Sequence, residues 1–99
     1  MLKISMIEND HKRQVVLEGK LVAPWTYELM SFGRDALNVG ERRELIIDLR
    51  SVTAISSEGE DVLFFLMNQG ARFRASGVFM RQVLKHLNRR SQLAKSTNA

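Results

Sequence analysis

Residues 44–63 read E-L-I-I-D-L-R-S-V-T-A-I-S-S-E-G-E-D-V-L, and they combine a strand, a turn and the start of a helix. The first six of them, Glu44 to Leu49, form a near-continuous apolar run. Such a run is typical of a strand that is covered on both faces, as in sheets flanked by helices. A polar turn follows, and the apolar run from Val62 predicts a buried helix of about four turns. This segment therefore favours an α/β fold.

The start of that helix carries a capping signal and a cluster of acids. Ser57 and Glu60 are three residues apart, so the Ser57 hydroxyl can accept a hydrogen bond from a free amide while Glu60 reaches back to the cap. The carboxylates of Glu58, Glu60 and Asp61 complement the positive end of the helix dipole. Because acids at a helix start are mostly dipole partners, we predict no Mg²⁺ or Ca²⁺ site among them.

Upstream of this segment the sequence predicts a β-hairpin. Lys3–Ile7 is a short strand candidate, and Arg13–Leu21 alternates apolar and polar residues in the manner of a half-buried strand. The residues between them, Glu8–Lys12, are polar and suit a turn.

A helix is expected after the hairpin. Pro24 stands where helices often begin, and Gly40 is placed to close the helix that spans Pro24 to Asn38. Its apolar positions recur at the spacing of one helical stripe: Trp25, Leu29, Phe32 and Ala36.

The C-terminal part predicts one more strand and one more helix. Gly77–Met80 lies between two helical patterns and is expected to form a brief strand. From Arg81 the pattern is helical again, with Val83, Leu84 and Leu87 on its apolar face. The element order is then β-β-α-β-α-β-α. We expect an α/β fold with α+β-like features, in which helices pack on a mixed sheet of about four strands, as one domain over residues 1–90 with a flexible tail over 91–99.

Composition excludes several classes of protein. The 99 residues are 44% hydrophobic and 26% charged, with one Pro, six Gly and no Cys, which suits one globular domain without disulfides, thiolate catalysis or Cys-ligated metals. The first residues hold no apolar stretch long enough for a signal peptide. The longest uncharged run, Val62–Ala71, is about half of the ~20 residues that a spanning helix needs. We expect a cytoplasmic protein without a membrane span.

The charge is unevenly distributed along the chain. Residues 1–61 hold all eleven acids and eight basic residues, a balance of −3, whereas residues 62–99 hold seven basic residues and no acid, which together give the net +4. Arg81, Lys85 and Arg89 stand at successive i+4 steps and form a basic patch on the last helix. Such a patch is either a solvated helix face or a surface for an acidic partner, nucleic acid or anionic lipid.

The sequence contains few residues that are placed for catalysis, so we predict no enzyme, no catalytic residue and no cofactor. His11 lies in a turn and His86 on a basic helix, and neither has a carboxylate at local spacing to orient it. No phosphate-binding glycine motif and no two-histidine metal spacing occurs. The nearest approach to a nucleic-acid motif, Arg72-Phe73-Arg74, is weak, so we do not expect this tripeptide to bind nucleic acid.

The central segment, Leu45 to Leu63, resembles the core of STAS domains, the fold of anti-sigma-factor antagonists. In that family a buried strand ending in Asp-Leu is followed by a loop of the type V-T-x-I-D-S-x-G. Residues 15–21, V-V-L-E-G-K-L, are similar to the family's early strand. The resemblance implies a STAS-like domain and covers most of residues 13–90.

The resemblance also implies a site. Ser57 falls where many members are phosphorylated by an anti-sigma factor that is also a kinase, and Gly59 falls on the loop glycine. Ser56, the second phosphorylation candidate, stands where the family commonly has aspartate. Glu58 replaces a small residue, and Glu60 and Asp61 replace apolar and small ones. Ser57 is then either a phosphorylation site, an ordinary helix cap, or both.

These observations predict a regulatory protein-binding module that contacts an anti-sigma factor or a related kinase-like protein through residues 56–61. Two alternatives remain open. In the first, the domain is a STAS-like subunit of a transporter or stress-signalling complex. In the second, it binds nucleic acid through the basic patch. A homodimer is also left open, because Phe64, Phe65 and Met67 suit a dimer contact as well as a core.

Overall fold

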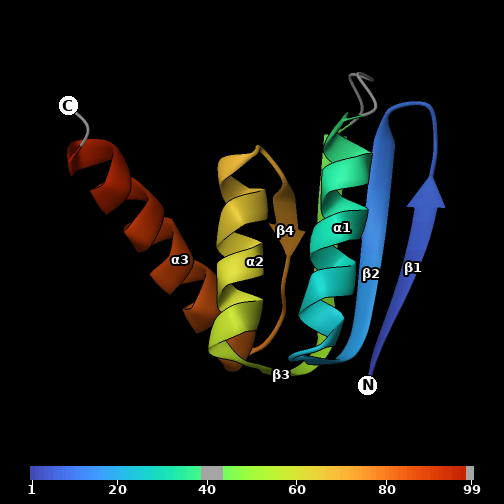
Figure 1. Ribbon diagram of the computed structural model, residues 1–99, viewed down its shortest axis with the longest axis horizontal. Helices are drawn as coiled ribbons and strands as arrows, with labels where there is room; N and C mark the ends of the chain where they lie inside the picture. The colour runs from blue at the N-terminus through green and yellow to red at the C-terminus, as the bar shows by residue number, and fades with distance from the viewer. Residues whose placement is uncertain (39–43, 98–99) are drawn as a thin grey trace.

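The computed structural model describes residues 1–38 and 44–97, which form a four-stranded sheet with three helices (Figure 1). The predicted element order and the α/β class with a mixed sheet are confirmed. The strands are β1 (Leu2–Glu8), β2 (Lys12–Leu21), β3 (Glu44–Ile55) and β4 (Arg72–Arg74), and the helices are α1 (Trp25–Asn38), α2 (Ser57–Asn68) and α3 (Val78–Thr97). Gly40, the expected end of the first helix, lies outside the described residues.

The strands lie in the order β1-β2-β3-β4, with β1 antiparallel to β2 and the other two pairs parallel. The hairpin turn is closed by the Asn9 side chain, whose Oδ1 accepts hydrogen bonds of 2.8 Å from the amides of His11 and Lys12. Both crossovers, β2–α1–β3 and β3–α2–β4, step in the same direction across the sheet. Since such crossovers are right-handed, α1 and α2 lie over the same face. Figure 1 shows them side by side there, with α3 leaning against α2.

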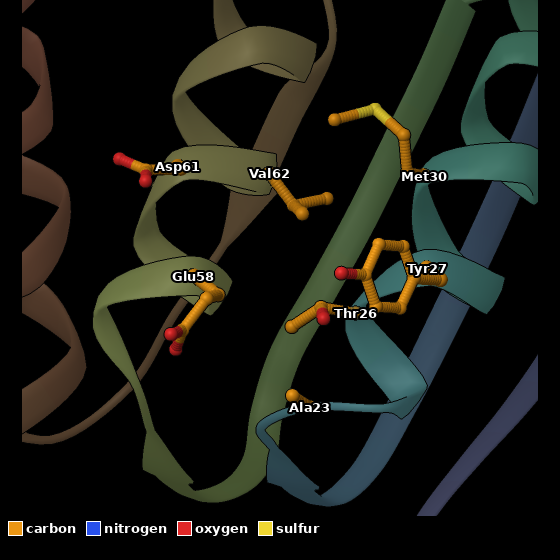
Figure 2. A pocket seen from close by; sticks show the side chains of 7 residues that line it. All are labelled: Ala23, Thr26, Tyr27, Met30, Glu58, Asp61 and Val62. Carbon is orange, nitrogen blue, oxygen red and sulfur yellow. The ribbon is translucent and has the colours of Figure 1, made fainter.

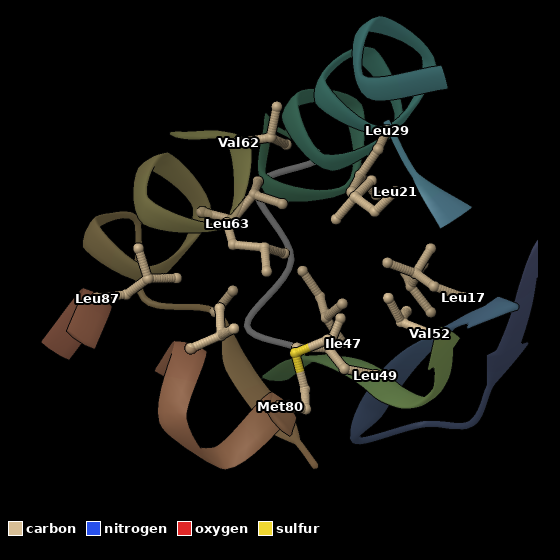
Figure 3. Close-up of a cluster of buried hydrophobic side chains, with 14 of the residues drawn as sticks. Leu17, Leu21, Leu29, Ile47, Leu49, Val52, Val62, Leu63, Met80 and Leu87 are labelled. Atoms are coloured by element: carbon tan, nitrogen blue, oxygen red, sulfur yellow. The ribbon is translucent and has the colours of Figure 1, made fainter. Parts of the chain in front are cut away.

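The hydrophobic core fills the space between this face and the helices (Figure 3). Alternate residues of β2 and successive turns of the helices point into it, as periods of 2 and 3.6 require. Full burial of one such side chain contributes about 1.5–3 kcal/mol, so the helical layer is held mainly by these contacts. The most deeply buried side chains are Val15, Leu17, Leu21, Leu29, Ile47, Leu49, Leu63, Leu66 and Leu87.

The central strand β3 is longer than the sequence indicates. All of Leu45 to Leu49 is buried, as expected, but the strand continues to Ile55 through residues that were expected to form a turn. The reason is pairing: β2 runs parallel beside it, and Leu21 lies in register with Ile55. Ladder hydrogen bonds to β2 thus extend β3 to the start of α2.

The expected strand Gly77–Met80 is wrong. The fourth strand is Arg72–Arg74, where Phe73 packs on the core between two exposed arginines. Val78 begins α3 instead, because Met80 continues the helical stripe of Val83 and Leu87 and is 2% exposed. The tripeptide weighed as a weak nucleic-acid motif is therefore a strand.

Helix α3 continues to Thr97, so residues 91–97 of the expected tail are helical, whereas residues 98 and 99 lie outside the described residues. Ser91 is 7% exposed, and its hydroxyl bonds to Oδ1 of Asn68 at 2.7 Å. This contact with the end of α2 holds the helix past residue 90. No helix in the described ranges is long and apolar enough to cross a bilayer.

Candidate protein-binding site

Helix α2 is capped by Ser56, so the expected capping box of Ser57 and Glu60 is wrong by one residue. Ser56 has extended backbone angles (φ −91°, ψ 173°), and its Oγ accepts a hydrogen bond of 3.2 Å from the amide of Gly59. The Ser56 amide donates to the carbonyl of Leu21 at 3.1 Å. Because this bond ties Ser56 to the end of β2, the helix begins at the next residue. Position N3 is then glycine, which has no side chain to complete a box.

Ser57 is the first residue of α2 and is exposed. Within the part of the chain that the structure describes, its hydroxyl makes no hydrogen bond. The two phosphorylation candidates therefore differ in kind: the Ser56 hydroxyl holds the helix start, and the Ser57 hydroxyl faces solvent.

Gly59, expected among the partner-contacting residues, is buried instead. A Cβ at this position would lie 2.5 Å from the carbonyl oxygen of Leu21 and 2.8 Å from Cγ1 of Ile55. Both distances are shorter than real Cβ contacts, so glycine is needed for α2 to lie directly against the ends of β2 and β3. Gly59 therefore allows the close approach of α2 to the sheet and is not itself at the surface.

The three acids of the site have different surroundings. Glu58 and Asp61 are exposed and Glu60 is half-buried. Asp61 Oδ1 accepts a hydrogen bond of 3.0 Å from Nη1 of Arg90, whose guanidinium also lies 4.1 Å from the ring centroid of Phe64. A basic residue from α3 thus neutralises one acid of α2 across a separation of 29 positions in sequence. The described residues contain no group of three or more His, Asp or Glu that could hold a metal ion.

A groove that sequence reasoning missed lies between the first turns of α1 and α2, and we call it the α1–α2 groove (Figure 2). Its volume is about 240 Å³. Tyr27 forms one wall and is 78% exposed, whereas Val62 on the opposite helix is 6% exposed. The feature of the sequence that could have indicated the groove is Tyr27, a large aromatic residue on the side of α1 opposite its apolar stripe. The lining residues are Ala23, Thr26, Tyr27, Met30, Glu58, Asp61 and Val62.

The predicted basic patch lies on the exposed face of α3. Arg81, Lys85 and Arg89 are all exposed, and none of them forms an ion pair within residues 1–38 and 44–97. Lys85 and Arg89 line a polar depression of about 220 Å³ together with Gln82 and His86. The residues weighed for a dimer contact, Phe64, Phe65 and Met67, are half-buried and pack against the core.

The only pKa shifts resolved within the described ranges belong to a pair outside this site. Asp48 is 3% exposed on the sheet face opposite the helices, and hydrogen bonds from Arg50 lower its pKa below the usual value in spite of burial. Its carboxylate accepts from Arg50 Nη2 at 2.7 Å, from Arg50 Nε at 3.0 Å and from Gln14 Nε2 at 3.1 Å. The same pair raises the pKa of Arg50. A carboxylate with so many bonds holds the sheet and is not available to a partner.

No family model and no curated protein matches the sequence. Among solved structures, the chain is similar to the anti-sigma factor antagonist SpoIIAA in its unphosphorylated form, with a TM-score of 0.67 and 15% identity over 86% of this chain and 82% of that chain. It is also similar to the STAS domain of an antisigma-factor antagonist from Rhodobacter sphaeroides, with a TM-score of 0.57 and 17% identity over 77% and 86% of the two chains.

A third match is an uncharacterized protein from Shewanella loihica with a SpoIIAA-like fold, with a TM-score of 0.57 and 13% identity over 88% and 77% of the two chains. All three matches cover most of both chains. The chain therefore has the STAS-like fold to which its central strand, turn and helix start are similar in sequence.

Proposed function

We propose that this domain is a cytoplasmic regulatory module that binds a partner protein, such as an anti-sigma factor with kinase activity, through the N-terminal end of α2. The contact surface is formed by Ser57, Glu58, Glu60 and Asp61, and the domain itself makes and breaks no covalent bonds. The observation that carries the proposal is the exposed Ser57 hydroxyl at a helix start in a fold shared with two anti-sigma-factor antagonists.

Phosphorylation of Ser57 would act on this surface and leave the helix cap in place. A phosphoserine adds a charge of roughly −1.5 to −2, which the free amides and the dipole of a helix start stabilise. Glu58 opposes the added charge, whereas Asp61 already pairs with Arg90. Because Ser56 supplies the cap, modification of Ser57 changes the charge that a partner meets more than it changes the fold.

The test compares two serine variants. Mass spectrometry of the protein from its native host should find phosphate on Ser57. Ser57→Ala should remove it and change capture of the partner, while Ser51→Ala, at an exposed serine of β3, should alter neither. Capture of a kinase-like or sigma-regulating protein that depends on Ser57 supports the proposal. Capture that is identical for both variants and insensitive to Glu58→Lys overturns it.

The basic patch of α3 favours a second candidate, binding of nucleic acid. Arg81, Lys85 and Arg89 have no acid from their own chain to neutralise them within the described residues, which leaves them available to phosphates. Retention on heparin or DNA with a steep salt dependence would support this function. Elution at low salt would exclude it.

A further inference from the structure

We propose that the α1–α2 groove receives an apolar side chain of the partner protein that stands beside a lysine or arginine in the partner's sequence. The proposal rests on the proposed function, because it names what the partner presents to this end of the domain. Both helices that border the groove begin at the carboxyl end of the parallel strands β2 and β3, which is where the Ser57 surface also lies (Figures 1 and 2).

The size of the groove favours a side chain over a small-molecule ligand. Pockets for small molecules usually measure ~300–1,000 Å³, and a groove of about 240 Å³ is below that range. It is large enough for one extended or branched apolar side chain together with part of its backbone. A short peptide segment is the occupant that this volume fits.

The lining of the groove is mainly apolar, and the carboxylates of Glu58 and Asp61 lie on its α2 side. Val62 and Met30 project toward each other from the two helices, and Ala23 closes the lower end (Figure 2). Thr26, which is 4% exposed as a residue, also lines the groove.

The charge around the groove selects a cation. Two carboxylates, those of Glu58 and Asp61, line the groove, and Arg90 pairs with Asp61. Glu28 and Glu60 lie in the first turns of the two helices. No lysine or arginine lines the groove. A lysine or arginine in the occupant would therefore meet the carboxylate of Glu58, which has no ion-pair partner among the described residues.

Two aromatic rings of α2 lie beside a guanidinium group, which Tyr27 lacks within the described residues. The guanidinium of Arg90 lies 4.1 Å from the centroid of Phe64, and that of Arg34 lies 5.6 Å from the centroid of Phe65. Tyr27 has no such cation from its own chain among the described residues. A cation of the partner placed over this exposed ring would complete the same interaction, which contributes about 0.5–1 kcal/mol at exposed sites.

A second copy of the chain is the competing occupant. Val78 and Phe79 are 78% and 51% exposed and are followed by Arg81, so they resemble the segment that the groove is expected to take. Both residues belong to the first turn of α3, so a second copy would present a helix end and not a short extended segment. We therefore assign the groove to a partner protein, and the oligomeric state of the chain in solution tests the second copy.

The test is an NMR titration of the full chain with three capped peptides, Gly-Lys-Leu-Arg-Gly, Gly-Glu-Leu-Glu-Gly and Gly-Lys-Ser-Arg-Gly. The first peptide should shift the amide signals of Tyr27, Met30 and Val62, and each of the other two should bind at least fivefold more weakly. Tyr27→Ala should weaken the first peptide about fivefold. Ile7→Ala, at an exposed apolar residue of β1 on the opposite face of the sheet, should leave it unchanged.

Equal binding of the three peptides, or binding that Tyr27→Ala leaves intact, overturns the groove proposal. So does self-association in sedimentation that Phe79→Ala abolishes, because the groove would then hold a second copy. Failure here is distinguishable from failure of the proposed function. If a partner is captured through Ser57 and Tyr27→Ala does not change that capture, the groove proposal is wrong and the proposed function stands. If the peptide binds in the groove but no partner is captured through Ser57, the proposed function is wrong and the groove still binds a cationic peptide.

Discussion

Carboxylates occupy two contrasting regions of the molecule. On the sheet face opposite the helices, Asp48 is 3% exposed and accepts hydrogen bonds from Arg50 and Gln14. At the start of α2, Glu58 and Asp61 are exposed, and only Asp61 has a partner within the described residues, the half-exposed Arg90. The same functional group thus stabilises the fold in one region and remains available to another molecule in the other.

Burial explains the difference. A carboxylate taken out of water needs its hydrogen bonds supplied by the protein, so its loss leaves donors unsatisfied and lowers stability. A carboxylate at the surface keeps its water, and an ion pair there contributes little to stability. The comparison predicts that substitutions at the first region change folding and that substitutions at the second change binding.

The largest effect is expected for Asp48→Asn. The amide keeps the shape of the side chain but removes the charge that Arg50 and Gln14 bond to, so the free energy of unfolding should fall by about 2–3 kcal/mol. Chemical denaturation of the purified variant measures it. A loss below about 0.5 kcal/mol would show that the network contributes no more than a surface pair.

The pH dependence of stability should report the same carboxylate. Its pKa is lowered in the folded state, so its contribution is fully present above the unfolded pKa of ~3.9 and is lost as the pH falls through the folded value. As the pH falls below about 4, the denaturation midpoint of the wild type should therefore decrease more steeply than that of Asp48→Asn. Parallel curves for the two proteins would contradict this assignment.

Next in size is Gly59→Ala. The added methyl group would stand against the carbonyl of Leu21, so α2 must move away from the ends of β2 and β3 at a cost of about 2 kcal/mol. Thermal denaturation gives the loss of stability. NMR signals of the groove residues should shift as well, because Val62 moves with the helix; an unchanged spectrum would rule out this displacement.

Substitution of the two serines at the start of α2 should have different effects on the free energy of unfolding. Ser56→Ala removes the hydroxyl that accepts from the Gly59 amide and should lower the free energy of unfolding by about 1 kcal/mol. Ser57→Ala should change it by less than about 0.5 kcal/mol. If the two losses were reversed, Ser57 would be the cap.

The smallest effect is expected for Asp61→Asn, which weakens the pair with Arg90 at the surface. Both side chains are largely exposed, at 64% and 45%, so the loss of stability should stay below about 0.5 kcal/mol. Urea denaturation of Asp61→Asn and Asp48→Asn under the same conditions compares their losses of stability directly. Similar losses in the two variants would break the distinction between buried and exposed carboxylates.

Much of the fold could be predicted from local patterns. The hairpin, the first helix and the strand-to-helix segment were predicted correctly in kind, because each has its own apolar period or turn residues. The fourth strand was misplaced, since Arg72-Phe73-Arg74 is too short to stand out against the helical patterns on either side. The end of β3 was also missed, because pairing with β2 decides it.

The position of the candidate site could be proposed from the sequence, whereas its local geometry could not. The position of Ser57 and of the acids follows from the central segment alone, and phosphorylation of Ser57 stays a prediction. The cap at Ser56, the burial of Gly59 and the pairing of Asp61 all depend on other elements, namely the end of β2 and the last helix.

The amino-acid sequence alone determined the order of strands and helices and the acids at the start of α2, because periodicity and charge act between neighbours in the chain. Only the tertiary structure decided which serine is free, which acid is neutralised and where a groove opens between α1 and α2. These features arise where residues distant in sequence are packed within a few ångströms of one another, and no local pattern encodes that distance.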